Sequence, residues 1–160
     1  MKTLQILRHA KTERLQLGQQ DKDRKLTERG LNQMADLLAN QQDNLSQAQL
    51  VLVSTAKRTR MTLKQMEHLF SKEAIQFDDH LYLASLVTLA KTIEQQDDHL
   101  TNLLLIGHND GLSDFVSFLV GEHHYLPTSG YFVLELEIES WQHLSIGIGR
   151  IRASYFSEVR

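Results

Sequence analysis

An arginine and a histidine stand side by side where the first apolar segment of the chain ends. Residues 3–7 predict a short buried strand, and Arg8 and His9 follow it directly. A hydrophobic core has no need of this pair, whereas a phosphate site does. Arginine holds phosphoryl oxygens in a bidentate fork, and histidine can accept the phosphoryl group. A solvated strand end is the alternative interpretation of so short a motif, so the rest of the chain has to separate the two.

Two later apolar segments end in a similar way. Residues 50–53 and 103–106 predict strands that are covered on both faces. The polar side chains that follow them are Ser54, Arg58, His108 and Asn109. In open parallel sheets, ligands lie outside the carboxyl ends of the strands, at a switch in strand order. We therefore expect these side chains to meet Arg8 and His9 at one edge of a sheet.

Two residues are unusual for the helices in which they are expected. Arg58 falls in the first turn of a helix, where a cation is unfavourable because the helix N-terminus carries the positive pole of the dipole. An anion docked at that end would remove this cost. Long side chains that reach into water are the alternative. Gly30 falls in the first turns of another helix at a cost of about 1 kcal/mol relative to alanine, which close backbone packing would explain.

Composition predicts one domain over residues 1–160. Of the 160 residues, 41% are hydrophobic and 23% are charged, which is enough for one core. The sequence has no cysteine, which excludes disulfides, thiolate zinc sites and cysteine nucleophiles. No apolar run has membrane length, and residues 1–7 are too short and polar for a signal peptide. We therefore expect a cytoplasmic protein with no membrane partner.

The net charge of −3 conceals an asymmetry along the chain. Residues 1–64 hold 12 Lys and Arg against 6 Asp and Glu, whereas residues 65–160 hold 5 against 14. A basic concavity can therefore attract an anion to a protein that is acidic overall. A solvated surface of mixed charge is the alternative. The basic residues lack interleaved aromatic residues or a recognisable binding motif, so we expect no nucleic-acid partner.

Apolar spacing predicts alternating strands and helices. Helices are expected to begin at Thr27, at Ser54 or Thr55, at Leu83 and beyond His108, with a short strand over residues 75–77. The inward face of the first helix is expected to carry Leu31, Met34, Ala35 and Leu38.

The C-terminal quarter has a different pattern. Residues 131–139 alternate strictly, with apolar side chains on one side and glutamates on a second side that is expected to meet water. Residues 144–148 repeat the alternation and predict its hairpin partner, and residues 153–160 are expected to be loosely ordered. The fold class is therefore α/β, with a mostly parallel central sheet, helices on both faces and a C-terminal antiparallel edge hairpin.

These segments resemble the histidine phosphatase superfamily, also called phosphoglycerate mutase-like. The resemblance rests on four segments: Arg8-His9-Ala10, residues 24–30 (RKLTERG), residues 51–54 followed by Arg58, and residues 106–109 (IGHN). It extends over residues 3–129. The short length and the LTERG segment are most similar to its small SixA-type phosphohistidine phosphatases.

The resemblance implies roles for the matching residues. His9 matches the nucleophile that forms a phosphohistidine intermediate. Arg8 and Arg58 match the arginines that hold the phosphoryl oxygens. His108 matches the second histidine, which contacts the phosphoryl group and stabilises charge in the transition state. Arg24 matches a further basic residue near the pocket mouth.

The residue types suit this chemistry without the resemblance. Phosphoryl transfer needs alignment and positive charge around three oxygens, and two arginines and two imidazoles supply both without a metal or another cofactor. His9 must be neutral at the attacking nitrogen, so its other nitrogen is expected to donate to a backbone carbonyl. His108 is expected to be protonated or at least to donate a hydrogen bond. From the resemblance, Arg24 and Asn109 are expected to bind substrate.

The absence of a proton donor bears on the substrate. Larger members of the superfamily carry a mid-chain glutamate that protonates an alkoxide leaving group, whereas residues 81–87 here contain none. Proton donation contributes typically 10²–10⁴-fold, so an enzyme without it suits a bond that breaks readily, such as the P–N bond of phosphohistidine. Asp78, Asp79 and Glu13 remain possible donors. The pocket is expected to be shallow and open, which suits a phosphorylated side chain of a protein.

We therefore expect a hydrolase that removes phosphate from phosphohistidine in a protein. One alternative is a phosphatase for a small phosphomonoester such as a sugar phosphate, favoured if one of those three carboxylates points at the phosphate. The other alternative is a module that binds phosphohistidine without hydrolysing it. Such a module would not need the nucleophile His9.

Overall fold

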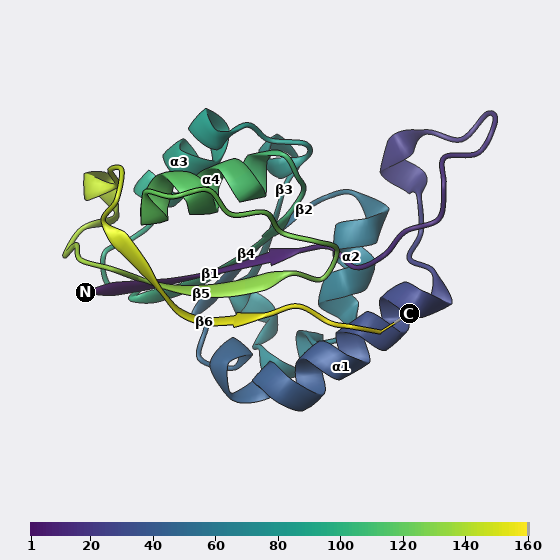
Figure 1. Ribbon diagram of the computed structural model, residues 1–160, viewed down its shortest axis with the longest axis horizontal. Coiled ribbons are helices and arrows are strands. Elements are labelled where there is room, and N and C mark those ends of the chain that lie inside the picture. Colours follow the sequence, from purple (N-terminus) through teal and green to yellow (C-terminus); the bar gives the residue numbers. More distant parts are fainter. Residues whose placement is uncertain (160) are drawn as a thin grey trace.

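A six-stranded sheet forms the centre of the computed structural model, which describes residues 1–159 (Figure 1). Its strand order is β3-β2-β4-β1-β5-β6. The strands are β1 (Lys2–Arg8), β2 (Leu50–Ser54), β3 (Ile75–Asp78), β4 (Asn102–Gly107), β5 (Tyr131–Leu136) and β6 (Gly149–Tyr155). The helices are α1 (Glu28–Leu45), α2 (Lys57–Lys64), α3 (Leu86–Glu94) and α4 (Gly111–Val120). Within residues 1–159, none of the helices combines the length and the apolar character that a bilayer crossing requires.

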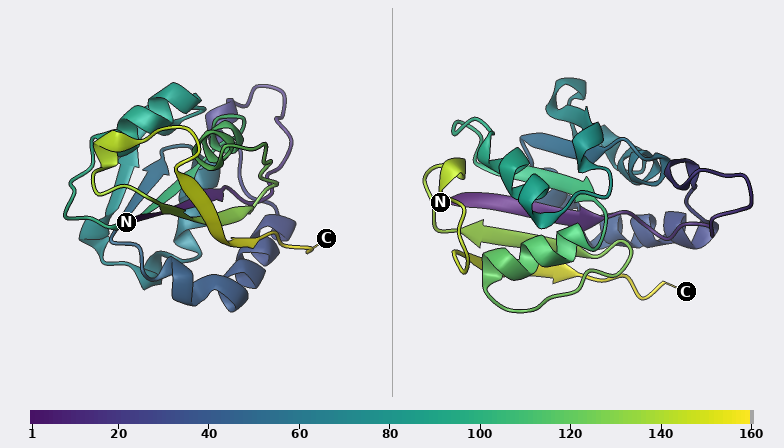
Figure 2. Two further views of the ribbon diagram at one scale, coloured as in Figure 1. Left: turned by 60° about the vertical axis from the view of Figure 1, so that its left-hand side comes forward. Right: turned by 90° about the horizontal axis from the view of Figure 1, so that it is seen from above.

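The four strands β1 to β4 are parallel, and β5 is antiparallel to both β1 and β6. The right-hand view of Figure 2 shows the opposed arrows of β1 and β5. The α/β class, the mostly parallel sheet and the antiparallel C-terminal edge pair are confirmed. The chain passes from β1 to β2 and later returns to place β4 between them. The switch in strand order therefore lies at β4, which makes its carboxyl end the expected place for a ligand.

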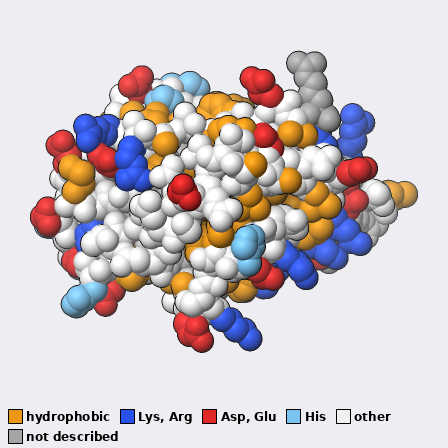
Figure 3. Space-filling view, turned by 90° about the horizontal axis from the view of Figure 1, so that it is seen from below, with side chains coloured by type: hydrophobic (Ala, Val, Ile, Leu, Met, Phe, Trp, Pro, Cys, Tyr) orange, Lys and Arg blue, Asp and Glu red, His pale blue; other side chains and the backbone are white. Residues whose placement is uncertain are grey.

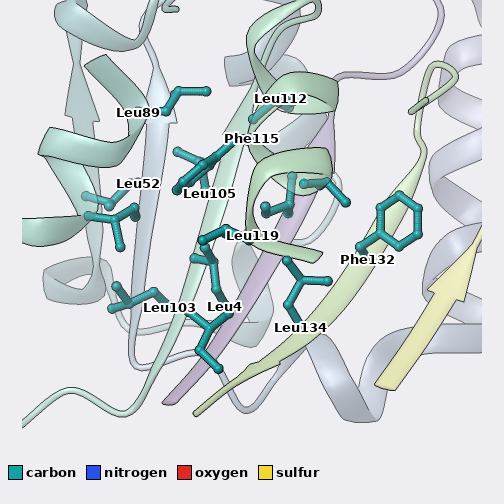
Figure 4. Close-up of a cluster of buried hydrophobic side chains, with 14 of the residues drawn as sticks. Leu4, Leu52, Leu89, Leu103, Leu105, Leu112, Phe115, Leu119, Phe132 and Leu134 are labelled. Carbon is teal, nitrogen blue, oxygen red and sulfur yellow. The ribbon is translucent and has the colours of Figure 1, made fainter. Parts of the chain in front are cut away.

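Helices α3 and α4 cover one face of the sheet, and α1 and α2 cover the other (Figure 1). On the face of α3 and α4, Leu4, Leu103 and Leu105 project from the strands toward Phe115 and Leu119 of α4 (Figure 4). All five side chains are fully buried. The helix expected beyond His108 is therefore confirmed, and its apolar face packs on the sheet.

Helix α1, on the opposite face, begins as predicted but is rotated about its axis. Thr27 is its N-cap and accepts a hydrogen bond from the Gly30 amide at 3.1 Å. The buried residues of the helix are Gly30, Gln33, Met34, Leu37 and Leu45. Leu31 and Ala35, which were expected to point inward, are exposed. The rotation follows from Gly30, which packs against the backbone of Lys11. A Cβ atom on Gly30 would be 2.3 Å from the Lys11 carbonyl oxygen. The expected close packing at Gly30 is confirmed.

Two predicted helix starts are wrong. Helix α2 has Ala56 at its N-cap without a side-chain hydrogen bond, so neither Ser54 nor Thr55 caps it. Helix α3 begins at Leu86 with Ser85 as its cap, three residues later than predicted. Leu83 has a φ of 48°, and this left-handed conformation cannot continue into a right-handed helix.

The predictions for the C-terminus need the largest correction. The partner of β5 is β6, not residues 144–148, and residues 153–155 pair with β5 instead of being loosely ordered. A short helical turn at Trp141–His143 follows β5, and the buried Trp141 indole donates to the Leu100 carbonyl at 2.8 Å. Residues 144–148 follow this turn and lead into β6, and the Ile148 carbonyl accepts from the Glu137 amide at 3.1 Å.

The second face of β5 does not meet water along its whole length. Tyr131 and Val133 belong to the cluster that α1 covers, and both are fully buried. The alternation of glutamates begins only at Glu135, where the cover ends. On this face of residues 131–139, the first half is therefore buried under α1 and only the second half meets water.

Candidate active site

Strand register brings the candidate catalytic side chains together. Arg8 of β1 pairs with Gly107 of β4, so His9 and His108 follow at the same level. Their ring centroids are 5.4 Å apart. Ser54, at the end of the neighbouring β2, places its Oγ 2.7 Å from Nε2 of His108. The carboxyl ends of three adjacent strands thus form one floor.

A cavity of about 320 Å³ opens above this floor. All six residues predicted for the site line it: Arg8, His9, Arg24, Arg58, His108 and Asn109. The other lining residues are Lys11, Thr12, Asp21, Leu83 and Thr128. Four cations therefore face one carboxylate, as a site for an anion requires. On the face seen in Figure 3, Lys and Arg side chains gather at the right-hand end, the end toward which β1 points in Figure 1.

His9 has the protonation state of a nucleophile. The residue is 5% exposed, and Nδ1 donates to the Ala10 carbonyl at 2.8 Å. Burial lowers the pKa of His9 to about 3, and the charges of Arg8 and Arg58 act in the same direction. The ring is therefore neutral at physiological pH, and Nε2 carries the lone pair. The expected donation from the other ring nitrogen to a backbone carbonyl is confirmed.

His108 is neutral as well. Burial lowers its pKa to about 3, and the charge of Arg58 contributes to the shift. The expectation of a protonated His108 is therefore wrong for this structure, and the expectation that it donates a hydrogen bond as a neutral ring remains. Its Nδ1 is buried and has no hydrogen-bond partner among residues 1–159.

Backbone and carboxylate oxygens hold the two arginines, and within residues 1–159 the buried Nε of each has no partner. Arg58 is 1% exposed, and its two terminal nitrogens bind the carbonyl oxygen of Asp21 at 2.8 Å and the Asp21 carboxylate at 3.0 Å. Nη1 of Arg8 binds the Leu126 carbonyl at 3.1 Å. The Nε atoms of both arginines are buried without a partner in the described part of the chain. Buried donors are normally paired, so these atoms and Nδ1 of His108 suit a bound anion with several acceptor oxygens.

Asp21 is the functional residue that sequence reasoning missed. Its carboxylate accepts hydrogen bonds from Nε of Arg24 at 3.0 Å, from Arg58 and from the Tyr82 hydroxyl. Burial raises the pKa of Asp21, but the bonds from Tyr82 and Arg58 and the two guanidinium charges outweigh this and lower the pKa to about 2. The residue lies in a polar loop without periodicity. Its spacing of three residues from Arg24 was the available signal.

The side chains of Arg24 and Asn109 line the pocket and also form hydrogen bonds with neighbouring segments of the protein. Nη1 of Arg24 binds Thr12 Oγ1 and the Glu13 carbonyl, each at 3.2 Å. The Asn109 amide donates to the Leu126 carbonyl at 2.8 Å, and its oxygen accepts from Ser113 Oγ at 2.7 Å. Asn109 therefore fixes the wall of the pocket, and a direct contact with substrate stays a prediction.

The three carboxylates considered as proton donors do not line the cavity. Asp79 binds the Thr55 hydroxyl and Lys22. Asp78 accepts from the His80 amide, and the Glu13 carboxylate accepts from Gln19. Each is thus engaged outside the pocket.

Comparison with known proteins agrees with a site for phosphoryl groups. The family model of the histidine phosphatase superfamily (branch 1) matches residues 4–82, which include Arg8, His9 and Arg58. An uncharacterized protein of Mycobacterium leprae is 29% identical over 136 residues, which cover 79% of this chain and 82% of that protein.

Solved structures extend the likeness to the whole chain. A structure from Agrobacterium tumefaciens, assigned as a phosphohistidine phosphatase SixA, has a TM-score of 0.83 and 26% identity, with 98% of each chain covered. A mycobacterial glucosyl-3-phosphoglycerate phosphatase has a TM-score of 0.63 and 14% identity, and covers 94% of this chain and 97% of its own. The second likeness concerns the fold alone. The matching family model over residues 4–82, the shared fold and the two histidines at adjacent strand ends all point to the histidine phosphatase superfamily.

Proposed function

We propose that this phosphatase removes phosphate from phosphohistidine in proteins, without a metal, through a phosphohistidine formed on His9. One observation carries the choice of substrate. Asp21 is the only carboxylate among the described lining residues, and a carboxyl group whose pKa is about 2 holds no proton at neutral pH. The pocket therefore offers a nucleophile and positive charge but no carboxylic acid for the leaving group.

The first step is attack by His9. Its Nε2 lone pair forms a bond to phosphorus while the bond from phosphorus to the leaving group breaks. The positive charge that develops on the imidazole is stabilised by the Ala10 carbonyl, which accepts from Nδ1. Arg8 and Arg58 hold the phosphoryl oxygens during the transfer, as the unpaired Nε donor on each of them allows.

The second step is hydrolysis of the phosphoenzyme. The oxygen of a water molecule attacks phosphorus, the P–Nε2 bond breaks, and the water gives up a proton as inorganic phosphate forms. His9 returns to its neutral state with Nδ1 still bound to Ala10. The two steps require the same arginines and the same charge, so one pocket serves both.

The leaving group decides which substrates react. An alkoxide needs a proton as it departs, and a positioned donor contributes typically 10²–10⁴-fold. An imidazole that already carries a proton on its other ring nitrogen departs from phosphorus as a neutral molecule, so it needs no proton donor in the pocket. The absence of a protonated carboxyl group in the pocket thus favours the P–N bond of phosphohistidine over an alkyl phosphate ester.

Two other functions remain to be separated from this one. A small phosphomonoester is the alternative substrate, because the fold is shared with a glucosyl-3-phosphoglycerate phosphatase. The positions of Asp78, Asp79 and Glu13 outside the cavity argue against it. A non-catalytic phosphohistidine-binding module would not need His9 held as a neutral nucleophile.

The test is a turnover assay after treatment with EDTA. A phosphohistidine-containing protein, an aryl phosphate and an alkyl phosphate are compared with the wild-type protein and with His9→Ala. Rapid loss of phosphohistidine, weak ester hydrolysis and an inactive variant are expected. His80→Ala, which changes an exposed histidine outside the pocket, is the matched control and should keep full activity.

Each contrary outcome has a definite meaning. Efficient alkyl ester hydrolysis would favour the small-phosphomonoester phosphatase. Activity that survives in His9→Ala would remove the nucleophile from the account. Binding of phosphohistidine without hydrolysis of any of the three substrates would favour the binding module.

A further inference from the structure

Ser54 is a buried polar residue whose place in the site is not explained by phosphate binding. It is the last residue of β2, its side chain is fully buried, and it does not line the cavity. Its Oγ does not cap helix α2, which begins after Ala56 without a side-chain cap. The hydroxyl oxygen instead lies 2.7 Å from Nε2 of His108.

The surroundings of Ser54 indicate the direction of this hydrogen bond. A serine hydroxyl has one proton to donate and two lone pairs that accept. The backbone amide of Ala56 already donates to Oγ at 3.4 Å. Nε2 of His108 is the only acceptor for the hydroxyl proton within residues 1–159, because no other hydrogen bond of Oγ is formed there. The buried hydroxyl is satisfied only if it donates to Nε2.

Donation to Nε2 places the proton of the neutral ring on the other nitrogen. Nδ1 of His108 is buried and has no partner among residues 1–159. Two other buried nitrogens without a partner, Nε of Arg8 and Nε of Arg58, belong to residues that line the same cavity as His108. All three atoms would then be N–H donors. The opposite tautomer would place a lone pair on Nδ1. That lone pair would repel the phosphoryl oxygens that the two guanidinium groups bind.

We propose that Ser54 is a positioning residue that fixes His108 as the Nδ1–H tautomer, so that this ring donates to the phosphoryl group. The effect on turnover rests on the proposed function, whereas the tautomer is a property of the folded protein alone. A neutral imidazole has a single N–H group, so the choice of tautomer decides whether His108 attracts or repels a phosphoryl oxygen. Loss of one donor to developing charge costs typically 10²–10³-fold in kcat.

The tautomer is measured first, on the wild-type protein. Long-range ¹H–¹⁵N correlation spectra of protein labelled at histidine, with the signals of His108 assigned by comparison with His108→Gln, identify the protonated nitrogen. The spectra are recorded with and without inorganic phosphate. A proton on Nδ1 in both samples is expected. A proton on Nε2 would overturn the proposal, whatever the substrate of the protein.

The second measurement compares Ser54→Ala with the control Thr55→Ala. The Thr55 hydroxyl, which the control removes, binds Asp79 outside the pocket. With an aryl phosphate, Ser54→Ala should lower kcat/KM by about 10–100-fold, the range for groups that orient an imidazole in a metal site. Thr55→Ala should leave it unchanged. The spectrum of Ser54→Ala should show a mixture of both tautomers at His108, a change that a purely structural role of Ser54 would not produce.

A double-mutant comparison shows whether Ser54 acts through His108. Introduced into His108→Ala, the change Ser54→Ala should have no further effect on kcat/KM, because coupled residues are not additive. Two independent losses that multiply would contradict the proposal. If Ser54→Ala does not fold, Ser54→Cys keeps a weak donor at the same place and should show an intermediate activity, and full activity would contradict the proposal.

A protein that hydrolyses none of the phosphates would refute the proposed function but not this inference. The affinity for inorganic phosphate, measured by calorimetry, then replaces turnover. Ser54→Ala should weaken phosphate binding about 10-fold, by analogy with the loss of outer partners in metal sites. An unchanged affinity, together with an unchanged tautomer of His108, would overturn the role of Ser54.

Discussion

The carboxylate of Asp21 binds the guanidinium group of Arg58 at 3.0 Å, and the backbone carbonyl of Asp21 binds the same group at 2.8 Å. The pair joins the long loop after β1 to the start of α2 (Figure 1). Arg24 binds the second oxygen of the same carboxylate. Asp21 thus orients two cations of a pocket for anions. Its carboxylate is also an anion beside Arg58, as the position of Arg58 in the first turn of a helix had indicated.

Replacement of Asp21 by asparagine should therefore lower activity although it makes the pocket more basic. The amide cannot hold both guanidinium groups, and displaced positioning groups cost up to about 100-fold. We expect Asp21→Asn to reduce kcat/KM for an aryl phosphate by about 10–100-fold. Asp23→Asn, two residues away and exposed, is the control and should behave as wild type. An Asp21→Asn protein as active as the wild type would show that the arginines are held without the carboxylate.

The two pocket histidines should make the protein less stable in mild acid. Burial lowers the pKa of both His9 and His108 from 6.5 to about 3. Between these values the unfolded chain binds more protons than the folded one, so the free energy of unfolding falls as pH falls below 6.5. Above pH 6.5 neither ring contributes to the pH dependence.

Urea denaturation at pH 7 and pH 5 measures this effect. The slope is about 1.4 kcal/mol per pH unit for each ring, so His9→Gln should lose about 2 kcal/mol less than wild type over this interval. His80→Gln changes an exposed ring and should follow the wild type. Identical pH dependence in wild type and His9→Gln would contradict the neutral, buried state of His9.

Gly30→Ala should destabilise the protein in spite of the higher helix propensity of alanine. The added Cβ would lie 2.3 Å from the Lys11 carbonyl oxygen and 3.1 Å from its amide nitrogen, so the backbone beside the pocket must move. We expect a loss of about 1–3 kcal/mol in the free energy of unfolding, as for overpacking in a core. Asn32→Ala, at an exposed position of the same helix, should be neutral or slightly stabilising. Equal effects of the two changes would mean that α1 can shift away from Lys11 without strain.

Tyr155 tests whether the C-terminal strand is fixed to the fold. Its hydroxyl donates to Asp36 at 2.8 Å and accepts from Asn40 at 2.9 Å, which joins β6 to α1. Tyr155→Phe should reduce the free energy of unfolding by about 1 kcal/mol and leave kcat/KM unchanged, because the residue does not line the cavity. Ser154→Ala, at an exposed position of the same strand, is the control and should behave as wild type. A loss of activity in Tyr155→Phe would connect β6 to the site in a way that the structure does not explain.

The sequence predicted those parts of the site that follow buried strands. Arg8, His9, Arg58 and His108 were recognisable because an apolar run ends just before each of them or before the helix that carries it. Parallel strands place such ends at one edge whatever their length, so topology alone brings these residues together. The same logic predicted β4 and the helix that follows it.

The features that the sequence did not predict depend on tertiary contacts. Asp21 lies in a loop, and its partner Arg58 is 37 residues away. Leu31 was expected to be buried because helical spacing identifies an apolar face but not the angle at which that face meets the sheet. The contact between Gly30 and Lys11 sets this angle. Residues 144–148 alternate as a strand would, but they form the connection between the buried turn at Trp141 and β6, which is the strand that pairs with β5.

The most direct test of the central claim is the dependence of kcat/KM on the leaving group. A series of aryl phosphates with phenols of increasing pKa is measured in the presence of EDTA, since kcat/KM reports formation of the phosphoenzyme on His9. Without a proton donor in the pocket, kcat/KM should fall steeply as the phenol pKa rises, and Asp21→Asn should lower every rate without changing the slope. A flat dependence that extends to alkyl phosphates would show that a group in the pocket protonates the leaving oxygen, and would contradict the account.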